Sequence, residues 1–216
     1  MFVPKIYQAR HREWSVEVVR NHPLATLIGN GPDGLLATHL PAIAVPETLA
    51  GGMGDTGLVG VTFLGHLNRA NPHWRAIREG GEALLVFQGP NGYISPAVYK
   101  TVPAAPTWNF VSVHAHGEIG PIESRDETLE VVKATVRAFE RDHGTSWDMT
   151  GSLSYFEKIV PAVGAFRFVV TAAEGMFKLS QEKKPGVRAM VADAFAGSDL
   201  PERRRVADIM RRWVGR

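Results

Sequence analysis

The sequence predicts an α+β protein whose antiparallel sheet closes into a small barrel, and three observations support this fold class. Apolar segments with the alternation of strands follow one another closely along the chain, which favours antiparallel neighbours. Short segments rich in glycine, proline and asparagine separate them, and such segments form tight turns. Segments with helical periodicity are expected to pack on the outside or at the ends of the sheet. No internal repeat is visible in the 216 residues.

The predicted helices and strands can be placed on the sequence in order. The first helix covers residues 10–22, where Trp14 and Val18 lie at helical spacing and Pro23 ends the helix. Strands are expected in residues 24–28, 35–45, 58–66, 82–89, 92–95, 107–120 and 164–175. Later helices are expected over residues 72–81, over 123–143 with Ser124 at its start, and from Pro185 onward.

Glycine-rich segments predict three connections. GPNG, residues 89–92, is expected to be the turn of a hairpin, and PETLAGGMGDTG, residues 46–57, a loop. Gly29, Gly31 and Gly34 match the G-x-G-x-x-G of dinucleotide-binding folds, which requires a helix directly after the glycines. Gly34 instead runs into the strand-like LLATHL, so a hairpin turn is predicted there.

Composition limits the kinds of protein that this chain can be. Hydrophobic residues make up 44% and charged residues 21%, which is typical of a globular chain with one sizeable core. Cysteine is absent, so disulfides, a thiol nucleophile and cysteine-ligated metal centres are excluded. The N-terminal segment carries charge and proline where a signal peptide is apolar, and no apolar run reaches membrane-spanning length. We therefore expect a soluble cytoplasmic protein without membrane contact.

The basic charge of the chain lies in its C-terminal tail. Residues 201–216 carry six arginines against Glu202 and Asp208, a net charge of +4, whereas residues 1–200 carry −2. A basic tail can bind nucleic acid, but this one also spaces apolar residues at helical intervals. These residues are Val206, Ile209, Met210 and Trp213. We therefore predict a helix packed on the protein, with its arginines on the solvated side.

The segment LGHLNRANPHW, residues 64–74, combines polar side chains with a predicted helix start. Asn71 is a favoured N-cap and Pro72 suits the first helical position. Free N–H groups at a helix N-terminus attract anions, and Arg69 and His66 would add donors. The segment therefore predicts a phosphate site, with a capped helix and solvated polar residues as the alternative.

Three further segments hold candidate ligand-binding residues. In ATHLP, Thr38 and His39 interrupt an apolar strand before Pro41, as at a strand edge that a ligand approaches. In PTWNF, Trp108 offers an aromatic plane, and a half-buried core residue is the alternative. The candidates in FKLSQ are Lys178, Ser180 and Gln181. For that segment, an ordinary polar loop is the alternative.

Motifs for metal binding and hydrolysis are weak or missing. His114 and His116 lie two residues apart on one face of a predicted strand, as metal ligands can, but spacing fixes no third ligand. We therefore predict no metal site. The sequence holds no Walker loop, H-E-x-x-H motif or G-x-S-x-G nucleophile elbow, and no catalytic residues are assigned.

In their order, these motifs resemble the PaiB-type family, described as FMN-binding transcriptional regulators. The shared segments are MFVPKIY, HPLATLI, ATHLP, GHLNRANPHW, LLVFQGPNGYISP, PTWNFVSVHAHG and KLSQ, which reach Gln181. GH-x-x-RANP-x-W together with FQGP-x-x-YISP is the most specific combination. The resemblance implies a split β-barrel of the pyridoxamine-phosphate-oxidase type over residues 1–184, with residues 185–216 as a helical extension packed on it. It also implies a homodimer with FMN between the subunits.

The same resemblance gives the candidate residues one role. The FMN contacts that it implies are Thr38, His39, Leu40, Pro41, His66, Arg69, Asn71, Trp108, Lys178, Ser180 and Gln181. Arg69 and Asn71 would hold the phosphate with His66 nearby, and residues 38–41 would lie along the isoalloxazine edge. Trp108 or residues 178–181 would close the site from the partner subunit. The chain departs from the family pattern at Glu182, which stands after KLSQ in place of an uncharged amide.

Three hypotheses for function follow. The first is a flavoprotein with redox activity on a small molecule, in which FMN supplies the chemistry and the protein supplies binding and access. The second is a transcriptional regulator that acts on DNA or senses flavin, although no helix-turn-helix is evident in the sequence. The third is a barrel that binds another ligand in place of flavin, such as haem.

Overall fold

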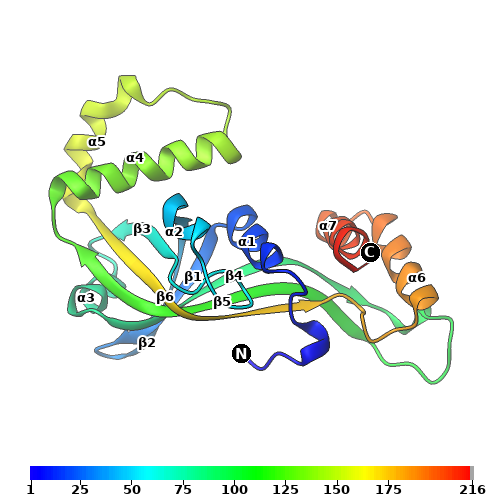
Figure 1. Cartoon of the computed structure of the whole chain (residues 1–216). Coiled ribbons are helices and arrows are strands. Elements are labelled where there is room, and N and C mark those ends of the chain that lie inside the picture. The colour runs from blue at the N-terminus through cyan, green and yellow to red at the C-terminus, as the bar shows by residue number, and fades with distance from the viewer. Residues whose placement is uncertain (215–216) are drawn as a thin grey trace.

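The computed structural model describes residues 1–214 and confirms the α+β class. Six antiparallel strands close into a ring in the order β1–β2–β3–β6–β5–β4, with β4 paired to β1. The strands are β1 (Leu24–Gly31), β2 (Gly34–Ala44), β3 (Thr62–Asn68), β4 (Gly81–Ile94), β5 (Thr107–Ile122) and β6 (Val163–Lys178). Figure 1 shows β4, β5 and β6 continuing beyond the shorter strands as a ribbon. The ring is therefore irregular, with a closed part and an extended part.

Helices cover the outside and the ends of this sheet, as predicted. The α-helices are α1 (Arg12–Asn21), α2 (Pro46–Ala50), α3 (Pro72–Glu79), α4 (Arg125–Asp142), α5 (Leu153–Ile159), α6 (Pro185–Ala196) and α7 (Pro201–Ile209). The short 3₁₀ turns are η1 (Lys5–Tyr7), η2 (Pro96–Val98), η3 (Thr150–Ser152) and η4 (Val160–Ala162), and η5 (Met210–Val214) is a π-helical turn. In Figure 1, α4 and α5 lie over one end of the sheet, and α6 and α7 lie at the far end of the ribbon.

Several local predictions are confirmed. Gly31 pairs with Gly34 across a two-residue turn between β1 and β2, so the glycine pattern forms a hairpin. Gly34 has a φ of 123°, a conformation that favours glycine. Ser124 caps α4 by accepting a hydrogen bond from the Glu127 N–H at 3.3 Å. These features depend on neighbouring residues alone, so the sequence is enough to predict them.

Two predicted connections are wrong. GPNG does not turn the chain, because β4 runs through it with a bulge between Gln88 and Asn91 and continues to pair with β5 as far as Ile94. The sixteen-residue β5 is long enough to pair with both halves of β4, and a bulge accommodates the extra residues. Residues 46–57 are not wholly a loop, because Pro46 opens the short helix α2. The helix α5 was not expected.

Phenylalanines fill the core of the ring. Phe63, Phe87, Phe166 and Phe168 have no solvent exposure and come from three strands of the ring. Gly65 of β3 makes room for this packing, because a Cβ there would lie 2.5 Å from the Phe166 ring. Alternation along β3 and β6 thus directs large side chains inward and leaves the intervening residues on the outer face.

The C-terminal tail packs on the protein through the predicted apolar face. Val206, Ile209, Met210 and Trp213 are all buried. Trp213 stacks on Trp14 of α1 with ring centroids 5.0 Å apart and 10° between the planes. Two residues far apart in sequence therefore hold the tail against the first helix.

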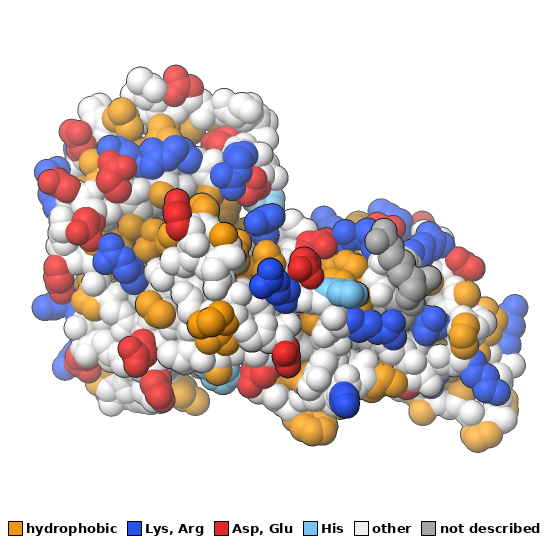
Figure 2. All heavy atoms as spheres, in the orientation of Figure 1, with side chains coloured by type: hydrophobic (Ala, Val, Ile, Leu, Met, Phe, Trp, Pro, Cys, Tyr) orange, Lys and Arg blue, Asp and Glu red, His pale blue; other side chains and the backbone are white. Residues whose placement is uncertain are grey.

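Five of the six tail arginines lie on the side away from the core and bond within the chain. The partners are the carbonyls of Tyr93 and Ser198 for Arg203 and Arg204, and the carboxylates of Glu202, Asp193 and Glu17 for Arg205, Arg211 and Arg212. Arg216 lies outside the described residues. On the face shown in Figure 2, basic side chains over the C-terminal helices lie beside acidic and apolar ones. None of the helices within residues 1–214 is long and apolar enough to cross a membrane.

We predict that Trp213→Ala lowers the free energy of unfolding by about 3 to 5 kcal/mol, because it removes a buried aromatic side chain. Urea denaturation measures the change. Arg211→Ala is the control, since it removes an exposed ion pair on the same segment and should cost less than about 1 kcal/mol. Equal losses in both variants would contradict the stacking contact as the main anchor of the tail.

Candidate functional site

Polar residues from β2 and the start of α3 form one hydrogen-bonded group. Asn71 caps α3 by accepting a hydrogen bond from the His73 N–H at 2.9 Å, and its amide donates to the Thr38 hydroxyl at 3.4 Å. The Nδ1 atom of His73 lies 3.0 Å from the same hydroxyl. We call residues 66–73, together with Thr38, the α3 corner. The predicted residues Thr38 and Asn71 meet here, whereas the buried His73 was missed.

Backbone donors at the α3 corner are already used within the chain. Pro72 has no N–H, the His73 N–H bonds to the cap, and the Trp74 N–H bonds to the Asn71 carbonyl at 2.9 Å. Just before the helix, the Ala70 N–H bonds to the Asn68 side chain at 2.8 Å. The prediction of free N–H groups at the helix N-terminus is therefore wrong for the first turn of α3, because the Asn71 cap and a tight turn satisfy these groups. An anion at this corner would have to be held mainly by side chains.

Arg69 is the cation of the α3 corner. Its backbone N–H donates to the Ala162 carbonyl at 2.9 Å and its Nε donates to the Val163 carbonyl at 2.8 Å. The guanidinium lies over the Trp74 ring, 5.3 Å from the centroid. Within residues 1–214, its two terminal nitrogens make no hydrogen bond and no ion pair, and the residue is exposed. Arg69 is thus oriented by the fold and keeps donors for an anion.

His66 of β3 has a largely buried ring at the α3 corner. His66 lies on the outer face of β3, between the buried Gly65 and Leu67, and its Nδ1 is buried without a partner among the described residues. Burial lowers the pKa of His66, so its ring is neutral near pH 7. A buried ring nitrogen usually has a hydrogen-bond partner, and His66 therefore offers one unfilled position at the α3 corner.

On β2, the candidate residues alternate between the two faces. His39 lies on the exposed face, where its Nδ1 is 3.0 Å from the Thr26 hydroxyl. Leu40 is 2% exposed and belongs to the core, so its side chain is not available to a ligand. Pro41 is half-buried on the same face as His39. Of residues 38–41, the side chains of Thr38, His39 and Pro41 thus remain as candidates.

A second set of predicted residues lies at the other end of the sheet. Trp108 is 51% exposed and packs edge-on against Tyr93 at 5.8 Å. The Lys178 ammonium donates to the Thr107 hydroxyl at 2.5 Å and lies 5.9 Å from the centre of the Tyr7 ring. We call Trp108 and residues 178–181 the ribbon end. Trp108 and Lys178 keep part of their surface available there.

The other polar groups of the ribbon end are used in the fold. Ser180 is fully buried with a φ of 63°, and its hydroxyl and the Asn109 side chain bond to each other at 3.0 and 3.1 Å. Gln181 folds onto its own segment, where its carbonyl accepts from the Leu179 N–H at 2.6 Å and its amide donates to the Phe177 carbonyl. These bonds shape the turn after β6 and leave few donors for a ligand.

Within one chain, the α3 corner and the ribbon end are far apart. Asn68 pairs with Val163, the first residue of β6, whereas Lys178 is the last residue of β6 and pairs with Phe110. A strand of that length extends about 50 Å, and Figure 1 shows α3 and the end of β6 at opposite ends of the sheet. A single chain therefore does not bring all the predicted residues into one site.

His114 and His116 lie on the same outer face of β5, as predicted. The Nε2 atom of His116 lies 3.2 Å from the Glu174 carboxylate, and the N-terminal amino group lies 3.5 Å from the same residue. Burial is the main cause of a lowered pKa at His114. Within residues 1–214, no group of three or more histidine, cysteine or acidic side chains is arranged to hold a metal ion. His116 thus belongs to a surface cluster with Glu174 and the N-terminal amino group, and His114 pairs with Glu174 across the two strands.

The fold together with the match to a family model defines a split-barrel protein of the flavin-binding class. Residues 1–172 match the family model described as "Putative FMN-binding domain", and the chain belongs to that family, whose cofactor is FMN. It is 26% identical to the Bacillus subtilis (strain 168) "Protease synthase and sporulation protein PAI 2" over 97% of this chain and 96% of the relative. This similarity bears out the resemblance to the PaiB type.

Solved structures share the fold. The FAD and haem binding protein from Mycobacterium smegmatis superposes with a TM-score of 0.57 at 16% identity, over 89% of this chain and 80% of that one. A flavocytochrome from Azotobacter vinelandii gives a TM-score of 0.51 at 15% identity, over 82% and 72%. At these identities, the likeness establishes the split barrel alone.

We predict that stability falls as the pH is lowered from about 7.5 to about 5.5. Burial is the first cause of the lowered pKa of His22, His66, His73 and His114, so the unfolded chain binds more protons than the native chain below the ordinary histidine pKa of about 6.5. Urea denaturation across this range measures the effect. His66→Gln should reduce the dependence of the free energy of unfolding on pH. A dependence as steep as that of the parent protein would contradict the burial of a neutral ring at this position.

Proposed function

We propose that this protein binds FMN at the α3 corner and uses it for redox chemistry on a small molecule. The observation that carries the proposal is the anchored, exposed guanidinium of Arg69, which is fixed by the Val163 carbonyl and keeps two nitrogens for the FMN phosphate. When bound, FMN supplies hydride and electron transfer, so the protein needs no acid–base pair of its own for that step.

The other residues of the α3 corner fit a flavin in a supporting role. The Thr38 hydroxyl is oriented by Asn71 and His73, and a fixed hydroxyl can hydrogen-bond to a polar atom of the ligand. The neutral ring of His66 has one buried nitrogen that finds no partner among the described residues, which suits a polar edge of the ligand better than a second phosphate charge. We infer that Arg69 binds the phosphate and that Thr38 and His66 help to orient the rest of the cofactor.

A homodimer would bring the ribbon end of one chain to the α3 corner of the other. Support comes from the outer surface of the sheet, where Leu24, Trp108 and Val169 are 65%, 51% and 42% exposed. Burial of these apolar side chains in a self-complementary two-fold interface would be favourable. In such a dimer, Trp108 and Lys178 would cover the flavin that Arg69 of the other subunit holds.

Regulation through DNA has less support. The family resemblance and the similarity to PAI 2 favour a regulatory role, and the basic tail was the part of the sequence suited to DNA. Five of its arginines are bonded within the chain, however, and binding to phosphates would have to compete with these contacts. We therefore place flavin chemistry first and do not assign the tail to DNA.

We predict that Arg69→Ala weakens FMN binding by about 1.5 to 3 kcal/mol, because a charge-assisted hydrogen bond to the phosphate is lost. Riboflavin binding should change much less, since riboflavin has no phosphate. Fluorescence titration with both ligands measures the difference. Arg75→Ala, which removes an exposed arginine of α3, is the control and should leave both affinities unchanged. An equal loss for FMN and riboflavin would remove the phosphate role from Arg69.

We predict that two defective chains restore FMN binding when they assemble together. Arg69→Ala and Trp108→Ala should each bind FMN weakly alone, because one lacks the phosphate contact and the other the cover. A mixed dimer has one site with both defects and one with neither, so random pairing should restore about one quarter of the sites. Equilibrium dialysis of the co-expressed chains measures the stoichiometry. Light scattering should give twice the 23.6 kDa of one chain.

If the two variants form mixed dimers and FMN binding is not restored, each flavin site lies within one subunit. A monomer mass with FMN still bound would contradict the shared site directly.

A further inference from the structure

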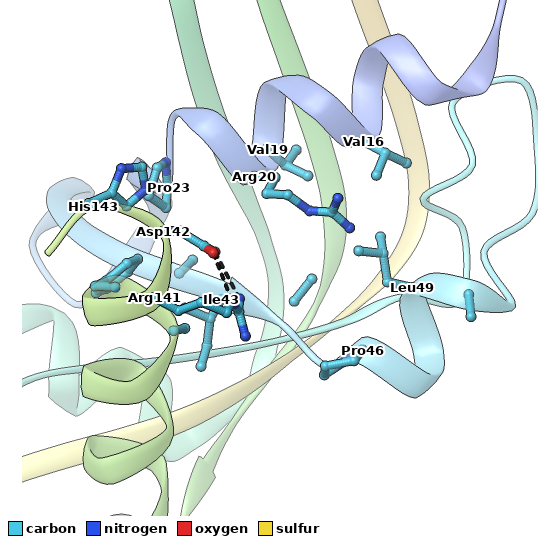
Figure 3. Close-up of a pocket in the computed structure, with 15 residues that line it drawn as sticks. Val16, Val19, Arg20, Pro23, Ile43, Pro46, Leu49, Arg141, Asp142 and His143 are labelled. Carbon is cyan, nitrogen blue, oxygen red and sulfur yellow. Dashed lines mark hydrogen bonds and ion pairs between the residues drawn. The ribbon is translucent and has the colours of Figure 1, made fainter. Parts of the chain in front are cut away.

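A cavity lies away from the α3 corner, between α1, the junction of β2 with α2, and the C-terminal end of α4. Its volume is about 520 Å³, within the range of small-molecule sites. Figure 3 shows the three elements around it. Ile43 of β2 lines this cleft, and it lies five residues from Thr38, or about 17 Å along the strand. We call this cavity the α4 cleft.

Apolar side chains form the floor and walls of the α4 cleft. Val19 and Ala42 are 3% and 1% exposed and belong to the core, and Leu49 of α2 packs against that core. Ala44 and Ala138 face the cleft from β2 and α4, where small side chains leave space. In the space-filling view, apolar side chains gather beneath α4 (Figure 2). The surface is suited to an aromatic or branched apolar group.

Charged residues stand at the mouth of the α4 cleft, and they are not equivalent. Arg141 donates two hydrogen bonds to Asp142 at 2.7 and 2.8 Å, so these two charges neutralise each other. Arg20 projects from α1 into the cleft (Figure 3), and within residues 1–214 it makes no hydrogen bond or ion pair through its side chain. His143 completes this side of the mouth. Among Arg20, Arg141 and Asp142, the mouth therefore carries one uncompensated positive charge, on Arg20.

The hollow along the first half of α4 provides a contrast. It has a volume of about 590 Å³, and its cations are paired with acids. Lys133 and Arg137 pair with Glu130 at 2.8 and 3.7 Å, and Arg167 pairs with Glu127 at 3.4 Å. An anion there would have to displace carboxylates that are already in place. At the α4 cleft, Arg20 makes no ion pair within residues 1–214, and the nearby Asp142 is held by Arg141.

We propose that the α4 cleft is a binding site for a small organic monoanion with an aromatic or branched apolar body. The apolar body lies on Val19, Ala42 and Leu49, and the carboxylate or sulfonate pairs with Arg20. Arg20 also lies in the last turn of α1, where a cation is favourable for the helix dipole. This stabilising role in α1 needs no ligand, so a test has to distinguish it from the binding of an anion by Arg20.

Two fluorescent probes of similar shape and different charge provide the test. The anion 1-anilinonaphthalene-8-sulfonate and the uncharged N-phenyl-1-naphthylamine are titrated into the full-length protein. Arg20→Gln should weaken binding of the anion roughly tenfold or more, because a hydrogen bond to a charged group is lost, and should leave the neutral probe unchanged. Ala138→Phe should weaken both probes, since the phenyl ring fills the cleft.

Arg137→Gln is the matched control, because it removes a paired cation of α4 that lies next to Ala138 in sequence and outside the α4 cleft. It should change neither affinity, and melting temperatures of all variants verify that the fold is retained. Equal effects of Arg20→Gln and Arg137→Gln, or no effect of Ala138→Phe, would overturn the proposal. Simple competition between FMN and the anionic probe would also overturn it, because it would show that the two ligands share one site. The comparison of Arg20→Gln with Arg137→Gln does not depend on where FMN binds.

Discussion

The antiparallel pairing of β5 with β6 is the constraint on which the rest of the molecule depends. It runs from Ile122 opposite Ala165 to Phe110 opposite Lys178, with one register shift after His116. One end of this pair carries β3 and the α3 corner, and the other end carries the ribbon end and the C-terminal helices. Because the two strands are long and paired throughout, the ends cannot fold back on each other. The separation of the candidate residues is thus a property of the sheet.

This constraint explains why the site looks incomplete in one chain. The α3 corner supplies an anchored cation and an oriented hydroxyl, but little that could cover a planar ring. The ribbon end supplies an exposed tryptophan and a lysine, but Ser180 and Gln181 there are bonded within the fold. Each end has what the other lacks. In a two-fold dimer, one self-complementary patch that includes both ends would place the ribbon end of each chain on the α3 corner of the other, which is the physical argument for the proposed shared site.

Local chemistry was enough to predict some elements and not others. The Asn71 and Ser124 caps and the turn before Gly34 follow from neighbouring residues, and the structure has all three. GPNG has the same local chemistry as a turn, but the length of β5 decides in favour of a bulge, and no local pattern reveals that length. Single residues gave several candidates for ligand contact, and only the combination of motifs pointed to FMN.

The candidate site shows the same division between local and distant information. Arg69 could be predicted from its place before the capped helix. The sequence does not reveal whether the N–H groups in the first turn of α3 are free, because their bonding depends on how tightly that turn closes. His73 was missed because its role requires Thr38, which is 35 residues away in the sequence. Ser180 could not be recognised as a buried partner of Asn109 until the strands were paired.

Helix α1 connects regions that would otherwise be independent. Trp14 stacks on Trp213, Glu17 pairs with Arg212 at 2.6 Å, and Val19 and Arg20 line the α4 cleft. The tail in turn packs on β4, where Arg203 bonds to the Tyr93 carbonyl beside Trp108. A ligand in the cleft could therefore affect the ribbon end only if it bound one position of α1 more tightly than another. Coupling of this kind is reciprocal. If a ligand in the α4 cleft changed the affinity for FMN by some factor, FMN would change the affinity of the cleft for that ligand by the same factor.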